Sequence, residues 1–202
     1  DGLEPELMNF TDEEDHDVHG HGTHCAGTIF GQNVDGRRIG IARGIRKPLI
    51  GKVLGQRGGD RASIVQAILW AQRRKAQVIS MSLGIDFPGF QRRLMQSGLR
   101  DVEASSIALM AYRENVWLFD RIADMFANDT VAGAPLLIAA AGNESNRNDY
   151  QLPQLHQPLP MAFYRLPPSI ANSRVPTLLT PMQIVVRRVW ISFRRRLAVV
   201  LV

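Results

Sequence analysis

The chain carries, at residues 19–29, the sequence His19-Gly20-His21-Gly22-Thr23-His24-Cys25-Ala26-Gly27-Thr28-Ile29. The stretch begins with alternating histidine and glycine and ends with small and apolar side chains, which predicts a loop that leads into a buried helix. Acidic residues crowd the segment between Asp12 and Asp17. A solvated surface loop is the simpler interpretation of that segment, and a cation site is the alternative.

Further along the chain, short apolar runs that end in glycine alternate with segments of helical periodicity. The apolar runs predict buried strands at residues 50–54, 78–83 and 136–141. The periodic segments predict helices over residues 63–76 and 101–128. In the second helix the candidate inner positions are Ile107, Met110, Leu118, Ile122, Met125 and Phe126. Strands that alternate with helices predict an α/β fold with a mostly parallel sheet.

The overall composition is that of a soluble globular protein, with 45% hydrophobic and 21% charged residues in a chain of 202. We expect no membrane span, because the most apolar stretch near the end, residues 183–202, is interrupted by five arginines. The single cysteine, Cys25, excludes an internal disulfide. The chain begins with Asp1 and shows no signal-peptide pattern, so we expect a processed chain or a fragment.

The last part of the chain differs in composition from the rest. Residues 151–202 contain seven arginines but no lysine, aspartate, glutamate or glycine. The remaining residues hold 17 basic and 19 acidic side chains, so the net charge of +5 comes from this tail. We therefore predict one domain over residues 1–150, followed by an aberrant tail over residues 151–202.

Four blocks of sequence, in order, resemble the subtilase family of subtilisin-like serine proteases (peptidase S8). His21-Gly22-Thr23-His24-Cys25-Ala26-Gly27 is similar to the family's histidine motif, and Ala139-Ala140-Ala141-Gly142-Asn143-Glu144 is similar to its oxyanion-asparagine motif. Between them, residues 50–54 and 78–84 resemble two strands of the family's sheet. The resemblance covers roughly residues 3–145 and implies a subtilisin-like three-layer α/β fold that is incomplete in this chain.

The resemblance implies roles for two catalytic residues. A serine hydroxyl is a weak nucleophile, so a neutral imidazole must take its proton and later pass it to the leaving amine. By resemblance, His21 is this general base and acid, and Asn143 donates its side-chain amide to the oxyanion of the tetrahedral intermediate. The alternatives are an ordinary loop histidine and an ordinary Gly-Asn turn after a strand.

Two short segments are implied to hold the substrate. Ser82, Leu83 and Gly84 resemble the segment that lines the family's primary specificity pocket and pairs with the substrate backbone. Gly58 and Gly59 fall where the family's other substrate-flanking strand lies. Together these segments would bind an extended polypeptide as an added strand. The alternative for each segment is a loop at a strand end.

No metal ligand is assigned from the sequence. His16, His19, His21 and His24 raise the alternative of a zinc cluster, but nothing in their spacing fixes three of them on one face. Calcium sites are common in the resembled family, so calcium is the cofactor that the resemblance allows. Secretion is typical of the family and implies an extracellular or periplasmic location, while the oligomeric state stays open.

Two parts of the family pattern are missing from the sequence. Asp1-Gly2 lacks the Thr or Ser of an Asp-Thr/Ser-Gly motif, and no Gly-Thr-Ser-Met-Ala serine motif follows Gly142, the last glycine. The segment of residues 85–134 is longer than we expect between the two family blocks on either side of it. We therefore expect an inserted helical hairpin or lid there. Without a nucleophile, covalent catalysis is excluded for this chain alone.

The sequence therefore predicts part of a serine endopeptidase that is inactive by itself. One alternative is a non-catalytic remnant that binds peptides. Another is a binder of nucleic acid or acidic lipid through the arginines of residues 187–196, which lie near two aromatic side chains. We rank this last alternative lowest and expect no nucleic-acid partner; it would predict salt-sensitive retention on heparin that is lost on deletion of residues 151–202.

A slip of the reading frame by one base near residue 150 would explain the composition of the tail. When the codons for residues 186–195 are read from their third base, allowed choices give Ala-Pro-Gly-Val-Asp-Ile-Val-Ser-Ala, which is similar to the block that precedes the serine in subtilases. Resequencing the gene across the codons for Asp149 to Val202 and beyond should reveal a one-base correction that restores this block and a serine motif after it. An unchanged reading with no serine motif downstream would contradict the frame slip.

Overall fold

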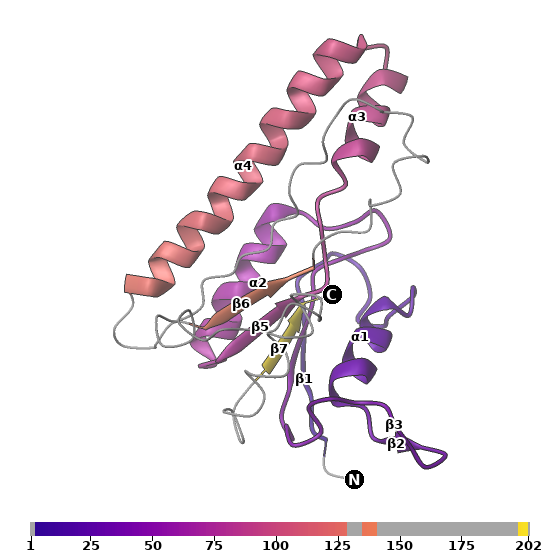
Figure 1. Ribbon diagram of the computed structural model, residues 1–202, viewed down its shortest axis with the longest axis vertical. Helices are drawn as coiled ribbons and strands as arrows, with labels where there is room; N and C mark the ends of the chain where they lie inside the picture. The colour runs from indigo at the N-terminus through magenta and orange to yellow at the C-terminus, as the bar shows by residue number, and fades with distance from the viewer. Residues whose placement is uncertain (1–2, 129–134, 141–197, 202) are drawn as a thin grey trace, which may run out of the picture. The chain divides into compact units, whose positions relative to one another are not determined.

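The computed structural model describes residues 3–128, 135–140 and 198–201 (Figure 1). The chain forms two compact units. Of the described residues, the first unit contains 3–82, 135–138 and 198–201, and the second contains 83–128, 139 and 140. Asn143 and the tail up to residue 197 lie outside the described residues, so the frame slip and the proposed domain boundary stay predictions.

The described sheet of the first unit is mostly parallel, as the sequence predicts. Its strands, which follow the order β1-β4-β7-β5-β6, are β1 (Glu6–Asn9), β4 (Leu49–Lys52), β7 (Ala198–Leu201), β5 (Val78–Met81) and β6 (Leu136–Ala139). Strand β1 pairs with β4 in parallel, and β7 pairs in parallel with both β4 and β5. Figure 1 shows the yellow strand β7 inside the sheet although it comes last in the chain. The predicted α/β class is therefore confirmed.

Two helices of this unit come from predicted segments. Helix α1 (His21–Phe30) follows the glycine–histidine stretch, and helix α2 (Arg61–Arg73) joins β4 to β5. The expectation that α1 is a buried helix is wrong, because Phe30 is its only buried residue. Its inner side packs Cys25, Ala26 and Ile29 against Phe30 and its core neighbours, while the rest of the helix presents polar residues to solvent.

The hairpin of β2 (Asn33–Val34) and β3 (Arg37–Arg38) follows α1 and was not predicted. Its two turn residues, Asp35 and Gly36, have φ angles of 49° and 72°. A two-residue type I′ turn, whose twist matches that of the flanking strands, requires positive φ at both central residues. An Asp-Gly pair adopts this conformation with little strain. The Asp-Gly dipeptide was therefore a usable sequence signal.

The core of the first unit is built where the helices meet the sheet. Phe30, Ala42 and Ile45 form one buried cluster, and Ile50 of β4 packs against it. Helix α2 buries Ala67, Ile68, Trp70 and Ala71. The Trp70 ring meets the Phe10 ring edge to face, with ring centroids 5.7 Å apart. Strand β5 adds Val78, which clusters with Ile138 of β6.

Two helices of the second unit lie within its described residues. Helix α3 (Phe87–Gln96) packs against helix α4 (Asp101–Asn128), and the bounds of α4 are those the sequence predicts. The Phe87 and Tyr112 rings meet edge to face with centroids 6.3 Å apart, and the Gln91 amide donates to the Ser105 hydroxyl at 2.7 Å.

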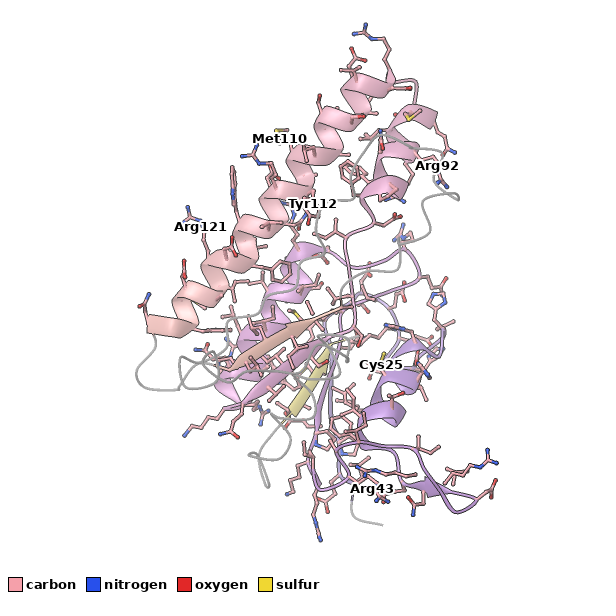
Figure 2. All side chains as sticks on the ribbon, viewed as in Figure 1. Cys25, Arg43, Arg92, Met110, Tyr112 and Arg121 are labelled. Carbon is pink, nitrogen blue, oxygen red and sulfur yellow. The ribbon has the colours of Figure 1, made fainter. Side chains whose placement is uncertain are left out.

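Part of the predicted inner face of α4 is wrong. Ile107, Met110 and Met125 are 37%, 60% and 46% exposed, and Figure 2 shows Met110 on the side of α4 away from α3. The buried residues of α4 are Ala104, Ala108, Phe119, Ile122 and Phe126. Two of these buried positions hold alanine, which a search for large apolar residues overlooks.

Asp60 starts helix α2 and offers a test of how the first unit is stabilised. Its carboxylate accepts hydrogen bonds from the N–H groups of Ala62 and Ser63 at 2.7 and 3.0 Å, and the Ser63 hydroxyl lies 2.6 Å from it. The hydroxyl of Ser63 and then its N–H hold the pKa of the Asp60 carboxyl below its ordinary value. The side chain therefore satisfies helix donors that would otherwise lack a partner.

We expect Asp60→Ala to lower the free energy of unfolding at neutral pH by about 1 kcal/mol, measured by urea denaturation. Asp60→Asn is the matched control, because it keeps an acceptor and removes the titration. Since the folded pKa is depressed, the contribution is complete above the unfolded pKa of about 4 and is lost as pH falls through the folded pKa. Below about pH 4, the free energy of unfolding should therefore change less steeply with pH in Asp60→Asn than in the unmodified protein. Equal slopes in these two proteins would contradict this role of Asp60.

Candidate active site

The first turn of α1 is held by a residue that sequence reasoning did not single out. The Asp17 carboxylate accepts from the Gly20 N–H at 2.9 Å and from the Thr23 N–H at 2.7 Å. The hydrogen bond from the Thr23 N–H is the main reason that the pKa of Asp17 is lowered. Gly20 has a φ of 74°, a conformation that favours glycine. The sequence signal that could have identified Asp17 is an acidic residue shortly before the start of a helix.

His21 is the first residue of α1, and its ring is bound to the end of another element. Its Nε2 lies 2.8 Å from the backbone oxygen of Ser82, which follows β5 directly. A carbonyl oxygen only accepts, so Nε2 carries the hydrogen and donates it. In a neutral imidazole Nδ1 is then the acceptor. The structure therefore joins two predicted site residues, one implied as catalytic and one as substrate-binding.

Cys25 lies beside the His21 ring, one helical turn along α1. Its Sγ is 4.0 Å from Nδ1 and 3.8 Å from Nε2. The thiol is half-buried, and the same side chain packs against the Phe30 cluster, so Cys25 joins the ring to the core. Figure 2 labels Cys25 on α1. A thiol is a weak hydrogen-bond donor, so the Ser82 carbonyl is the stronger of the two partners of this ring.

Gly58 and Gly59, the predicted flanking segment, lie in an exposed tight turn. The N–H and C=O groups of Gly55 and Gly58 bond each other at 3.0 Å in both directions, and Gly58 has a φ of 92°. A Cβ at Gly59 would lie 2.5 Å from the backbone oxygen of Val53. The glycines are thus needed for the turn itself, and their role in substrate binding stays a prediction. Leu83 and Gly84 are the first residues of the second unit.

The acidic segment before α1 is organised around Lys52. The Lys52 Nζ donates to the backbone oxygens of Glu14 and His16 at 2.6 and 3.3 Å and lies 3.7 Å from a carboxylate oxygen of Glu13. The Asn9 amide donates to the Glu13 backbone oxygen at 2.6 Å. An ammonium group thus supplies positive charge to these oxygens, which favours the surface-loop interpretation.

Two further features concern the part of the chain that the structure describes. There, no three His, Cys, Asp or Glu side chains come together as a metal ion would need. Over the same ranges, no helix combines the length and the apolarity of a membrane crossing.

The fold and the site define an α/β protein in which a helix begins with an exposed histidine bound to the end of a parallel strand. The family model described as "Subtilase family" matches residues 6–162, and the chain belongs to this family. No solved structure matches the chain.

Curated relatives match a shorter part of the chain. The "Intracellular serine protease" of Paenibacillus polymyxa is 41% identical over 83 residues, which are 38% of this chain and 25% of that protein. The "Major intracellular serine protease" of Bacillus subtilis (strain 168) is 40% identical over 84 residues, 38% of this chain and 26% of that protein. The "Thermostable alkaline protease" of Halalkalibacterium halodurans is 43% identical over 70 residues, 34% and 19% of the two chains. The matched residues thus span about a quarter or less of these relatives' length.

The contact with Ser82 predicts the tautomer of His21. In protein labelled with ¹⁵N-histidine, two-bond ring correlations should show His21 as the Nε2–H form at pH values where the ring is neutral. Alkylation of Cys25 with iodoacetamide should disturb this tautomer, because the added group needs space beside the ring. Cys25→Ala treated with the same reagent is the control. An Nδ1–H tautomer in the untreated protein would contradict the Ser82 contact.

Proposed function

We propose that the chain is part of a serine-type endopeptidase in which His21 is the general base and acid. The observation that carries the proposal is the placement of an exposed imidazole at the end of β5, 2.8 Å from the Ser82 carbonyl, in a chain of the subtilase family. Asn143 is proposed as the oxyanion donor, on the motif alone. The names of the relatives, all proteases, support the same reaction class.

The geometry at His21 indicates what must change before proton transfer. The general base of this reaction accepts the serine proton at Nε2, while Nδ1–H is held by a carboxylate. In the structure Nε2 carries the hydrogen and donates it to Ser82. Release of the Ser82 carbonyl and a change of tautomer are therefore required. The missing aspartate motif would supply the group that holds the other tautomer.

The proposed substrate is an extended polypeptide that pairs with the backbone of Ser82, and the roles of Leu83, Gly84, Gly58 and Gly59 rest on the family resemblance alone. A peptide N–H that bonds the Ser82 carbonyl would add the substrate as a strand at the end of the sheet. The same carbonyl holds the imidazole. A carbonyl oxygen has two lone pairs, so peptide and His21 compete for it where the peptide N–H approaches from the side of the imidazole, and we propose that it does. Calcium binding, which the family resemblance allows, stays a proposal to which no residue is assigned.

The chain by itself is proposed to bind peptide without cleaving it, since the sequence holds no serine motif. The purified 202-residue protein should show no cleavage of a chromogenic peptide and no labelling by a fluorophosphonate above the His21→Ala control. Measurable turnover that His21→Ala abolishes would contradict the proposed inactivity. The serine-protease assignment itself is tested by restoring the serine motif, which should bring turnover that depends on His21.

Binding of an extended peptide separates this role from that of an inert fragment. A fluorescent tetrapeptide should bind with an affinity in the micromolar range, and His21→Ala should bind about twofold to tenfold more tightly, because it frees the Ser82 carbonyl at the cost of one ordinary hydrogen bond. His24→Ala, the same substitution at an exposed position of the same helix, is the matched control. No binding by either protein would contradict the peptide site.

A further inference from the structure

Strands β1 and β4 end side by side at the edge of the sheet from which the chain leads to α1. They are parallel, and the last residue of β1, Asn9, faces the last residue of β4, Lys52, in register. The loop of residues 10–20 joins β1 to α1. The Asn9 amide donates to the Glu13 backbone oxygen of this loop at 2.6 Å. Both strand ends thus carry a polar side chain at the base of the loop that leads to His21.

Lys52 holds this loop by its ammonium group. Only 16% of its side chain is exposed, so the charge needs partners within the protein. An ammonium group has three hydrogens to donate and no acceptor. It donates to the backbone oxygens of Glu14 and His16 at 2.6 and 3.3 Å, and a carboxylate oxygen of Glu13 lies 3.7 Å away. All three oxygens come from one short stretch of the loop, which folds around the ammonium group.

The Glu13 carboxylate is itself fixed, so it gives the ammonium group a stationary counter-charge. Its Oε1 accepts from the Gln56 N–H at 2.8 Å. The same oxygen lies against Gly55, where an added Cβ would be only 2.5 Å from it. The turn that follows β4 therefore leaves space for the carboxylate and keeps it beside Lys52.

The bond to His16 connects Lys52 to the start of α1. The His16 oxygen belongs to the planar peptide group that joins His16 to Asp17. A bond to that oxygen limits where the group, and with it the Cα atom of Asp17, can lie. The Asp17 carboxylate in turn accepts from the N–H groups of Gly20 and Thr23 and holds the first turn of α1. Lys52 on β4 thus acts on α1 through one peptide group and one carboxylate.

His21 lies in the turn that Asp17 holds, and its ring contact depends on where that turn lies. Its Nε2 is 2.8 Å from the Ser82 backbone oxygen, and a hydrogen bond of this kind is lost once the two atoms are more than about 3.5 Å apart. A shift of about 1 Å at the start of α1 would break it. We propose that Lys52 is a positioning residue for His21, which acts through Asp17 to keep the imidazole at the Ser82 carbonyl. This inference rests on the proposed function, in which that imidazole is the general base.

Exchange of the His21 Nε2–H with water tests this role in the 202-residue protein, because the bond to the Ser82 carbonyl slows the exchange. In Lys52→Met the exchange, measured by NMR with ¹⁵N-labelled histidine, should be about fivefold faster, as expected for the loss of one ordinary hydrogen bond. Lys47→Met is the matched control, the same substitution at a lysine whose side chain is 73% exposed. Asp60→Ala is the control for stability, because it weakens α2 and does not touch this loop. Both controls should exchange as slowly as the unmodified protein.

Asp17→Ala breaks the next link and should speed the exchange to a similar extent. Lys52→Met added to Asp17→Ala should then have no further effect, since both act through the same turn. Propylammonium chloride supplies the atoms that Lys52→Ala lacks and should slow the exchange in that variant, whereas sodium chloride at the same concentration should not. The proposal is overturned if Lys52→Met exchanges like the unmodified protein, if Asp60→Ala exchanges as fast as Lys52→Met, or if the effects of Lys52→Met and Asp17→Ala add. If Lys52→Met does not fold, rescue of Lys52→Ala by propylammonium decides the question.

Peptide binding separates this role from the proposed function. A ring that is held less firmly leaves the Ser82 carbonyl free more often, so Lys52→Met should bind the fluorescent tetrapeptide more tightly, by up to the factor expected for His21→Ala. If no protein binds the peptide while Lys52→Met still speeds the exchange, the positioning role holds and the proposed peptide site is wrong. If the unmodified protein binds the peptide and Lys52→Met changes neither exchange nor affinity, the peptide site holds and the positioning role is wrong.

Discussion

The backbone hydrogen bonds that β7 makes with β4 on one side and β5 on the other are the constraint on which this structure depends. A strand that lies between two others turns its polar backbone groups toward its neighbours, so these groups need partners in the sheet. The β4-α2-β5 unit leaves room for one strand between its two strands. Four residues from the far end of the chain provide it. Strand β7, which is remote in sequence, therefore sets the spacing between β4, over which α1 packs, and β5.

The histidine site spans this distance. Helix α1 is packed over β4 through the contact of Ile50 with the Phe30 cluster, and Ser82 extends from β5. Asp17 fixes the first turn of α1, so that His21 starts from a defined backbone position. The ring itself is bound by one backbone carbonyl and backed by one thiol. A single hydrogen bond of this kind contributes about 1 kcal/mol net, so the ring is placed without being locked.

Local patterns predicted the elements whose sequence carries its own signal. Helix α4 has a long apolar period, and its bounds are as expected. Strand β1 was not predicted because Glu6 and Asn9 are polar and its apolar residues are exposed; it is recognisable only through its partner β4. Helix α3 begins with Phe87-Pro88-Gly89, a sequence that by itself predicts a loop. The signal for a helix start is the preceding Asp86, whose side chain accepts from the Gly89 N–H. The place of β7 depends on pairing across most of the chain, which composition does not reveal.

At the site, the motif predicted His21 and Ser82, but only coordinates could show that one binds the backbone of the other. That contact changes the chemical argument, because it assigns a single acceptor two uses in the proposed function. While the Ser82 carbonyl holds Nε2–H, the nitrogen that would act as base is occupied. A peptide that pairs with the carbonyl would displace the ring and expose Nε2. Substrate binding would then make the first of the two changes that activation of the base requires, the second being the change of tautomer, and specificity for an extended backbone would follow from the hydrogen bond that the substrate must replace.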